Sequence, residues 1–342
     1  MSASLSTLCH VENNGSYLVM HRTVKKNDVN KDKWIGIGGH FEADESPEEC
    51  MVREAMEETG LTLENLRYRG LVTFVSGGGV TEYMSLFSAD WNGDPKDALV
   101  PCDEGDLRWV HIEDIWDLNI WEGDKIFFRL LDENVPFFSL KLVYDGGDTL
   151  VYAALNGKEL ELFDILDENG NKTGVVRERG VAHRDGSLHG AVHSWIARKN
   201  EAGETELLLQ KRSDTKDSHP GCYDISSAGH IGHGEEPEDA AIRELREELG
   251  ISLKQEDLTF LGTRRAFDET TSHGFPFRDN EINYEFVTTV PVSDTMLRPD
   301  PEEVSGVLWL PLSKCLALIK TQEIPHCLAG DELLLLQNHF SH

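Results

Sequence analysis

The sequence predicts an α+β protein that contains two tandem copies of one domain. A chain of 342 residues is long enough for two domains of ordinary size, each with its own core. Residues 39–61 and 229–251 align without a gap at an offset of 190 residues, which suits a duplicated domain and is too long for a solenoid repeat. The same kinds of element flank both segments in the same order, which predicts one mixed fold formed twice.

Each aligned segment is expected to follow a β-hairpin, to form a helix and to precede a strand that contains tryptophan. Pro47 and Pro237, each followed by acidic residues, suit a first helical turn, and Gly60 and Gly250 suit the helix end. Apolar runs on either side of glycine-containing turn signals predict the hairpins. The hairpin strands are expected at residues 6–9, 16–21, 190–198 and 206–211, and the tryptophan strands at 107–110 and 307–310.

A further hairpin at residues 138–155 closes the first copy, with its turn at 145–148. Asn156 and Gly157 favour a turn, and a new apolar strand begins soon after them. We therefore expect the first domain to span residues 1–157 and the second to span residues 158–342.

The charge and apolar patterns exclude several classes of protein. Acidic residues outnumber basic residues by 62 to 32, and the net charge of −30 argues against nucleic-acid and anionic-membrane partners. No window approaches 18 consecutive apolar residues, and the N-terminus lacks a basic stretch followed by an apolar run, so we expect neither a membrane span nor a signal peptide. The six cysteines form no Cys-x-x-Cys pair and are typical of reduced thiols in a cytoplasmic protein.

Each predicted helix carries three glutamates at positions i, i+3 and i+4, which project from one face. The two sets are Glu54, Glu57 and Glu58 in the first helix, and Glu244, Glu247 and Glu248 in the second. Three like charges on one face repel one another unless a cation neutralises them, and carboxylate oxygens are the ligands that Mg²⁺ and Mn²⁺ prefer. One such set alone would favour a solvated acidic surface, but the same longer pattern occurs twice, which excludes chance.

The repeated segments resemble the Nudix box. Both match G-x5-E-x7-R-E-U-x-E-E-x-G-U, where U is an apolar residue, at every fixed position. The resemblance implies an α/β/α sandwich with a mixed sheet, and the hydrolysis of a nucleoside diphosphate linked to another group by water that Mg²⁺ or Mn²⁺ activates. It implies that the six glutamates bind metal. It also implies that Arg53 and Arg243 orient them, and that Glu45 and Glu235 are further ligands or general bases.

The first domain resembles MutT-type diphosphatases of oxidised purine nucleotides. The segments that carry this likeness are residues 33–39, 70–76, 102–105 and 118–124. The implied reaction converts 8-oxo-dGTP, or a similar triphosphate, to the monophosphate and pyrophosphate. Glu104 is a candidate general base, as an alternative to Glu45. Arg22 is a candidate phosphate contact and Asn119 a candidate reader of the base edge, although a strand-end arginine and a capping asparagine suit these positions equally.

The second domain resembles type 1 isopentenyl-diphosphate isomerases and is rich in histidine, since ten of the 14 histidines follow residue 158. The matching segments are residues 161–164, 180–183, 188–195, 208–212 and 220–230. Lys211 and Arg212, within these segments, are candidate substrate contacts. In the isomerases three histidines and two carboxylates hold a metal. The matching positions are His183, His189, His230, Asp279 and Glu281.

Two departures from the isomerase pattern favour a hydrolase. The isomerase cysteine aligns with Ala228, which can neither deliver nor accept a proton, and the box of the second domain is intact. We therefore expect hydrolysis of a second small phosphorylated substrate, a nucleotide or a prenyl diphosphate. Glu303, before Trp309, holds the position that Glu104 holds in the first domain. An isomerase or a prenyl-diphosphate phosphatase, and a nucleotide-sensing regulator, stay open as alternatives, as does the oligomeric state.

Overall fold

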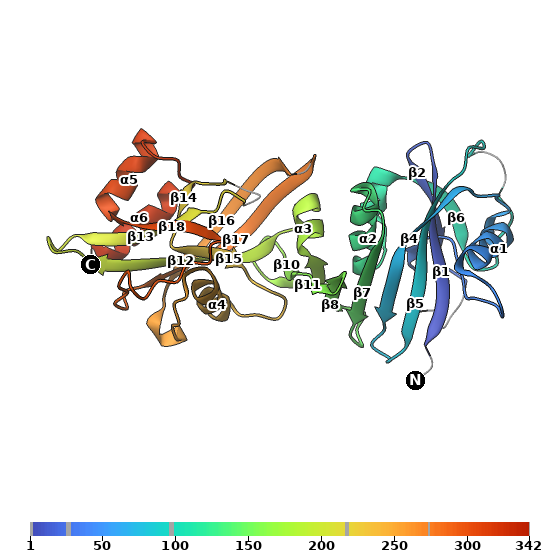
Figure 1. Cartoon of the computed structure of the whole chain (residues 1–342), viewed down its shortest axis with the longest axis horizontal. Coiled ribbons are helices and arrows are strands. Elements are labelled where there is room, and N and C mark those ends of the chain that lie inside the picture. Colours follow the sequence, from blue (N-terminus) through green and yellow to red (C-terminus); the bar gives the residue numbers. More distant parts are fainter. Residues whose placement is uncertain (1–2, 25–28, 96–98, 216–218, 273, 342) are drawn as a thin grey trace. The chain divides into compact units, whose positions relative to one another are not determined.

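The computed structural model describes residues 3–24, 29–95, 99–215, 219–272 and 274–341 (Figure 1). The chain divides into two compact units. The first is Met1–Leu162 with Val176–Val181, and the second is Phe163–Val175 with Ala182–His342. Both units are mixed α+β structures, as the sequence predicts. The predicted domain limits at residues 157 and 158 stay a prediction. Within the described ranges, none of the helices has the length and apolar character needed to cross a membrane.

The first unit contains one nine-stranded mixed sheet, which includes the order β3-β2-β1-β5-β4-β7-β8-β9, with β6 paired to β2. Strand β1 runs parallel to β5 and β4 runs parallel to β7, whereas the other pairs are antiparallel. The strands are β1 (Ser4–Asn13), β2 (Ser16–His21), β3 (Trp34–Ile35), β4 (Glu64–Val75), β5 (Thr81–Asp90), β6 (Asp106–His111), β7 (Phe138–Tyr144), β8 (Leu150–Leu155) and β9 (Lys158–Glu159). The helices are α1 (Pro47–Thr59), the 3-10 helix η1 (Ile112–Asp117) and α2 (Glu122–Asp132).

Helices α1 and α2 cover opposite faces of this sheet. Neighbouring residues of a strand point to opposite faces. Leu8 of β1 accordingly packs in the cluster that contains Phe127 of α2, whereas Cys9 packs in the cluster that contains Met51 of α1. The unit therefore has the α/β/α layers that the resemblance implies.

The second unit repeats this arrangement around a seven-stranded sheet of order β14-β13-β12-β17-β16, with β15 paired to β12 and β18 paired to β13. Strands β10 and β11 form a separate two-stranded sheet; the first residue of β10, the last three of β11 and the first three of α3 belong to the first unit. The strands are β10 (Leu162–Leu166), β11 (Lys172–Glu178), β12 (His189–Lys199), β13 (Thr205–Arg212), β14 (Tyr223–Asp224), β15 (Ser227–His230), β16 (Thr259–Ser272), β17 (Phe275–Thr288) and β18 (Val304–Pro311). The helices are α3 (Arg179–Asp185), α4 (Pro237–Leu249), the 3-10 helix η2 (Gln255–Asp257), α5 (Leu312–Thr321) and α6 (Gly330–Phe340). Helix α4 packs on one sheet face, and α5 and α6 pack on the other.

The two box helices form where the sequence predicts them and end in the same way. In α1, Ser46 and Glu49 form a capping box, which satisfies backbone N–H groups at the helix start. Gly60 and Gly250 follow the two helices with φ values of 73° and 71°, a left-handed conformation that glycine adopts without a steric penalty. The predicted hairpins at β1–β2, β12–β13 and β7–β8 are likewise confirmed.

The buried His10 of β1 contributes stability to the first unit that is lost in acid. Its ring lies 4.4 Å from that of Phe128, and neither ring nitrogen has a hydrogen-bond partner among the described residues. Burial lowers the pKa of His10 to about 3, so the unfolded chain binds a proton at His10 below about pH 6.5 that the folded chain does not. The stability that His10 contributes is therefore lost as the pH falls.

Urea unfolding should show about 2 kcal/mol less stability at pH 5 than at pH 7 from His10. His10→Leu should remove that difference, and an unchanged pH dependence in the variant would contradict the assignment.

Candidate functional site

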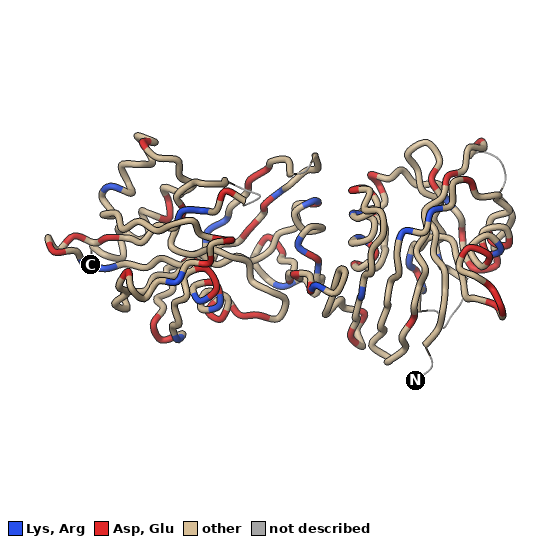
Figure 2. Tube along the Cα trace, in the orientation of Figure 1, with Lys and Arg blue, Asp and Glu red and all other residues tan. Residues whose placement is uncertain are grey.

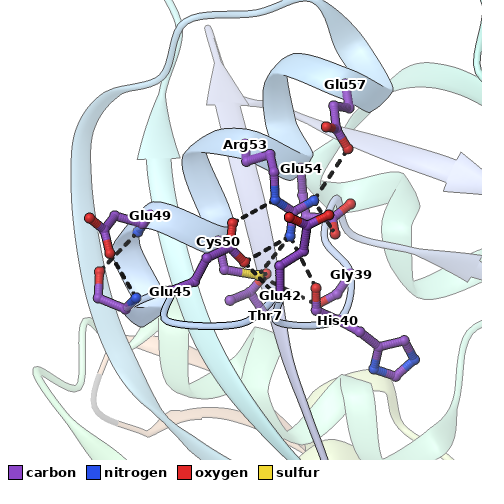
Figure 3. Close-up of polar contacts among 11 residues, drawn as sticks. Thr7, Gly39, His40, Glu42, Glu45, Glu49, Cys50, Arg53, Glu54 and Glu57 are labelled. Carbon is purple, nitrogen blue, oxygen red and sulfur yellow. Dashed lines mark hydrogen bonds and ion pairs between the residues drawn. The ribbon is translucent and has the colours of Figure 1, made fainter.

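Arg53 lies at the centre of the first box and binds three of its carboxylates (Figure 3). Its guanidinium donates twice to Glu45, with Nε–Oε1 2.6 Å and Nη2–Oε2 2.9 Å. The Nη1 atom lies 2.8 Å from Glu54 and 3.2 Å from Glu57, and Nη2 donates to the His40 carbonyl at 3.1 Å. One cation therefore fixes Glu54 and Glu57 of α1 and the loop before the helix.

Arg243 makes the same contacts in the second box. It donates to both oxygens of Glu235 at 2.9 Å, to Glu244, and to Glu247 at 3.3 Å. Its Nη2 also donates to the carbonyl of His230 at 2.9 Å. The duplicated pattern thus produces duplicated geometry. Acidic residues are spread along both units, and the box helices are among the acidic segments (Figure 2).

The glycine that begins each box leaves room for the first metal-candidate glutamate. A Cβ atom at Gly39 would lie 2.4 Å from Cδ of Glu54, and a Cβ at Gly229 would lie 2.1 Å from Cδ of Glu244. Both distances are shorter than any ordinary contact, so a side chain at either position would displace the carboxylate.

Gly39→Ala should therefore lower turnover by the first unit about tenfold on any diphosphate that it hydrolyses, because a small displacement of a ligand group costs rate. The measurement is the steady-state turnover of the full chain on a substrate of that unit. Gly146→Ala is the matched control, because a Cβ there meets nothing within 4 Å. Equal turnover in Gly39→Ala and wild type would show that the glutamate position is not constrained in this way.

The last glutamate of each box is buried and accepts a backbone N–H from the residue just before the box. Glu58 is 6% exposed and accepts from the Gly38 N–H at 3.0 Å. Glu248 is 5% exposed and accepts from the Ala228 N–H and from Nε2 of Gln210, both at 3.2 Å. Burial, with the charges of Glu54 and Glu104 adding to it and the Gly38 N–H opposing it, raises the pKa of Glu58 to about 8. Because burial disfavours the charged form of Glu58, a bound cation would stabilise that form.

Glu104 and Arg22 lie together beside the first box. They form an ion pair, and both charges act on Glu58. Glu45, in contrast, is held by Arg53 and by the Glu42 N–H at 2.8 Å, and these hydrogen bonds lower its pKa to about 2. A carboxylate of such low basicity is a poor proton acceptor. Glu104 is likewise paired with an arginine, and the choice of general base stays a prediction.

The Asn119 amide is engaged at both ends. Its Nδ2 donates to the Asp32 carbonyl at 2.9 Å, and its Oδ1 accepts from Nζ of Lys33 at 3.2 Å. The same lysine lies 4.7 Å from the ring centroid of Trp121. These contacts tie the Asn119 side chain to the segment that contains Asp32 and Lys33. Its role in recognising the edge of a nucleotide base stays a prediction.

Asp124, on α2, was not singled out from the sequence. It is 8% exposed, and burial raises its pKa to about 8, while the charge of Lys33 opposes the shift. The sequence signal that could have identified Asp124 is the presence of an acidic residue on the apolar, core-facing side of an amphipathic helix.

The substrate-contact candidates of the second unit lie on β13. The Arg212 guanidinium donates to Asp224 at 2.9 Å, and Lys211 is half-buried on the same strand. Glu303 lies in the turn before β18, where its carbonyl accepts from the Ser213 N–H at 2.9 Å. The backbone of Glu303 is therefore tied to the end of β13, next to Arg212.

Five predicted metal ligands of the second unit lie together, and we call them the histidine–carboxylate cluster. They are His183 of α3, His189 of β12, His230 of β15, and Asp279 and Glu281 of β17. Oδ1 of Asp279 lies 3.5 Å from Nε2 of His183 and 3.8 Å from Nε2 of His189. Oε1 of Glu281 lies 3.9 Å from Nε2 of His189 and 3.6 Å from Nε2 of His230.

The chemistry of this cluster fits a divalent metal. Nδ1 of His189 donates to the Ser187 carbonyl at 2.8 Å, which leaves the Nε2 lone pair facing the carboxylates. That Nε2 and Oδ1 of Asp279 are buried and lack a hydrogen-bond partner among the described residues. Burial, with a contribution from His230, lowers the pKa of His189 to about 3, so the ring is neutral, as a metal ligand must be.

Strand β15 separates this cluster from the second box. The His230 carbonyl accepts from Arg243, Gly229 lies against Glu244, and the Ala228 N–H donates to Glu248. The same four-residue strand thus supplies a ligand candidate to one cluster and the supporting backbone to the other.

A cavity of about 340 Å³ opens beside the second box. Glu235 lines it, together with Phe260 of β16 and Tyr284 of β17. Asp164 and Lys172 form an ion pair of 2.9 Å in its wall. The cavity therefore combines aromatic and acidic surfaces next to a box glutamate.

Comparison with protein-family models confirms the class that the fold and the paired boxes indicate. The NUDIX domain model matches residues 4–131 and 188–328. The chain belongs to this family and carries its domain twice.

The similar proteins include both hydrolases and isomerases. Nudix hydrolase 3 of Arabidopsis thaliana is 42% identical over 153 residues, which cover 44% of this chain and 19% of that protein. An uncharacterized Nudix hydrolase of Listeria monocytogenes is 35% identical over 180 residues, covering 52% of this chain and 96% of that protein. The isopentenyl-diphosphate Delta-isomerase of Paenarthrobacter aurescens is 33% identical over 151 residues, covering 44% of this chain and 76% of that protein.

Coverage of some relatives is partial. The match spans 49% of an uncharacterized Nudix hydrolase of Clostridium acetobutylicum, as well as 19% of the Arabidopsis protein. Among solved structures, a Mutator MutT protein from Bacillus halodurans gives a TM-score of 0.39 at 22% identity, with 45% of this chain and 99% of that chain covered.

Proposed function

We propose that the chain is a divalent-metal-dependent diphosphate hydrolase with one site in each unit. The observation that carries this proposal is the duplicated arginine contact, in which Arg53 and Arg243 each hold the glutamates of their own box. In each box the three helix glutamates would hold Mg²⁺ or Mn²⁺. When bound, such a metal offsets negative charge on phosphate oxygens and makes water more acidic.

The protein's own residues supply the remaining chemistry. Arg53 and Arg243 orient the ligands, and Glu104, beside Glu58, accepts the proton of the attacking water in the first unit. Arg22 orients Glu104 through their ion pair. Glu303 is our candidate for the corresponding base in the second unit, because it occupies the turn before β18.

For the first unit we propose an oxidised purine nucleoside triphosphate as the substrate, with a monophosphate and pyrophosphate as products. The support is the MutT-like sequence segments together with the complete box. For the second unit we propose another small diphosphate, either a nucleotide or a prenyl diphosphate. The acidic and aromatic cavity beside Glu235 would take the part of that substrate that is not phosphate.

A second candidate for the second unit is an isomerase, and the histidine–carboxylate cluster is the observation that favours it. Ala228 weighs against it, because no thiol occupies that position on β15. Incubation with isopentenyl diphosphate distinguishes the two: dimethylallyl diphosphate identifies an isomerase, and released phosphate identifies a hydrolase.

The direct test of the proposed function is a substrate screen with the full chain. Oxidised deoxynucleoside triphosphates, nucleoside diphosphate sugars and prenyl diphosphates are each incubated with Mg²⁺ and with excess EDTA, and the products are separated by chromatography. We expect hydrolysis of at least one substrate class with Mg²⁺ and none with EDTA. Hydrolysis that persists in EDTA would overturn the metal-dependent proposal.

A further inference from the structure

A second buried polar cluster lies near the histidine–carboxylate cluster. It contains His193 of β12, Arg264 of β16, Asn283 and Glu285 of β17, and Glu332 of α6. Asn283, Glu285 and Glu332 are each at most 2% exposed. The parallel pairing of β12 with β17 places His189 opposite Glu281 and His193 opposite Glu285. The two clusters therefore lie on the same face of the sheet, four residues apart along β12 and along β17.

This second cluster is not a further metal site, because an arginine already fills it. Arg264 forms ion pairs with Glu332 and, at 3.4 Å, with Glu285. Nδ1 of His193 donates to Oε1 of Glu332 at 2.7 Å. Although burial lowers the pKa of His193, the charges of Glu332 and Glu285 raise it to about 10, so both ring nitrogens carry protons at neutral pH.

Asn283 joins the two clusters. The amide orientation that satisfies all its neighbours places its nitrogen 2.9 Å from Oε2 of Glu281. Its oxygen then accepts from Nε2 of His193 at 3.1 Å and from Nη2 of Arg264 at 3.0 Å. Because Oε2 of Glu281 is held in this way, Oε1 is the oxygen that faces His189 and His230.

We propose that His193 and Asn283 are positioning residues, which fix Glu281 in the orientation that a metal ligand needs. This inference rests on the proposed metal site in the histidine–carboxylate cluster. An uncharged amide donor suits the role, because it restrains one carboxylate oxygen without competing for its charge as a lysine or arginine would. Through His193 and Glu332 the restraint extends to α6, so the ligand is anchored to two packed layers.

The test is a titration of the full chain with Co²⁺ in excess Mg²⁺, followed by visible absorption. Mg²⁺ occupies the glutamate boxes, whereas imidazole ligands favour Co²⁺. We expect wild type to bind Co²⁺ with the absorption bands of a histidine-containing site. Asn283→Leu, which is similar in volume and removes the donor to Glu281, should weaken Co²⁺ binding by about 10- to 100-fold. His193→Gln keeps one donor toward Asn283 and should lose less.

Ser194→Ala is the matched control, because Ser194 is a buried neighbour on β12 whose hydroxyl has no hydrogen-bond partner among the described residues. It should bind Co²⁺ as wild type does. Circular dichroism without metal reports folding, and if Asn283→Leu does not fold, His193→Gln carries the test. Wild-type affinity in the folded variants overturns the positioning role. Absence of the histidine-type bands in wild type overturns the metal site itself, which is a different result.

Discussion

Replacing Glu57 or Glu247 by glutamine should reduce hydrolysis by the altered unit about 10²- to 10³-fold. Each substitution keeps the shape of the side chain and removes the charge that would hold a divalent metal. A loss of about 3–4 kcal/mol of transition-state stabilisation corresponds to this range. Both side chains are more than half exposed, at 61% and 53%, so the fold should be unaffected.

The measurement is Mg²⁺-dependent turnover of the full chain on each substrate found in the screen. Glu57→Gln should reduce one activity to this extent and Glu247→Gln the other, which assigns substrates to units. Glu48→Gln is the control, because Glu48 is an exposed residue in the first turn of α1. If both single variants retained full turnover on every substrate, the assignment of the metal sites would be wrong.

Arg53→Lys should raise the Mg²⁺ concentration for half-maximal turnover by the first unit about 10- to 100-fold, because it weakens Mg²⁺ binding. An ammonium group cannot reproduce the paired N–H contacts to Glu45 while also reaching Glu54 and Glu57. The carboxylates of Glu45, Glu54 and Glu57 would all still be present, but no single side chain would hold them in place.

Arg243→Lys is the reciprocal variant and should affect the second unit alone. Arg67→Lys serves as the control, because Arg67 is half exposed and pairs with Asp90 at 2.8 Å on the surface. An unchanged Mg²⁺ dependence in both box variants would mean that the arginines do not orient the ligands.

The boxes could be predicted from the sequence because their contacts are local. Arg53, Glu54 and Glu57 lie within about one helical turn, so helical periodicity alone places them together. The glycines that end the helices follow from the same local rules. The α/β/α layers were implied by the resemblance, and the alternation of Leu8 and Cys9 on β1 accounts for them physically.

Other parts of the sites depend on strand register, which the sequence pattern does not define. His183 and Asp279 are far apart in the chain, and only the resemblance to isomerases suggested that they meet. The contacts of Asn283 with Glu281 and His193 require the register between β12 and β17. The engagement of the Asn119 amide by Asp32 and Lys33 depends on loop conformation, so periodicity gave no sign of it.

The short strand β15 has a consequence for how the second unit can diverge. Its backbone supports the box, and the ring of its last residue, His230, belongs to the histidine–carboxylate cluster. Ala228 contributes its N–H to the box, and its methyl group carries no polar role. A larger side chain at this position would change the chemistry available on β15 while the N–H contact with Glu248 stays in place.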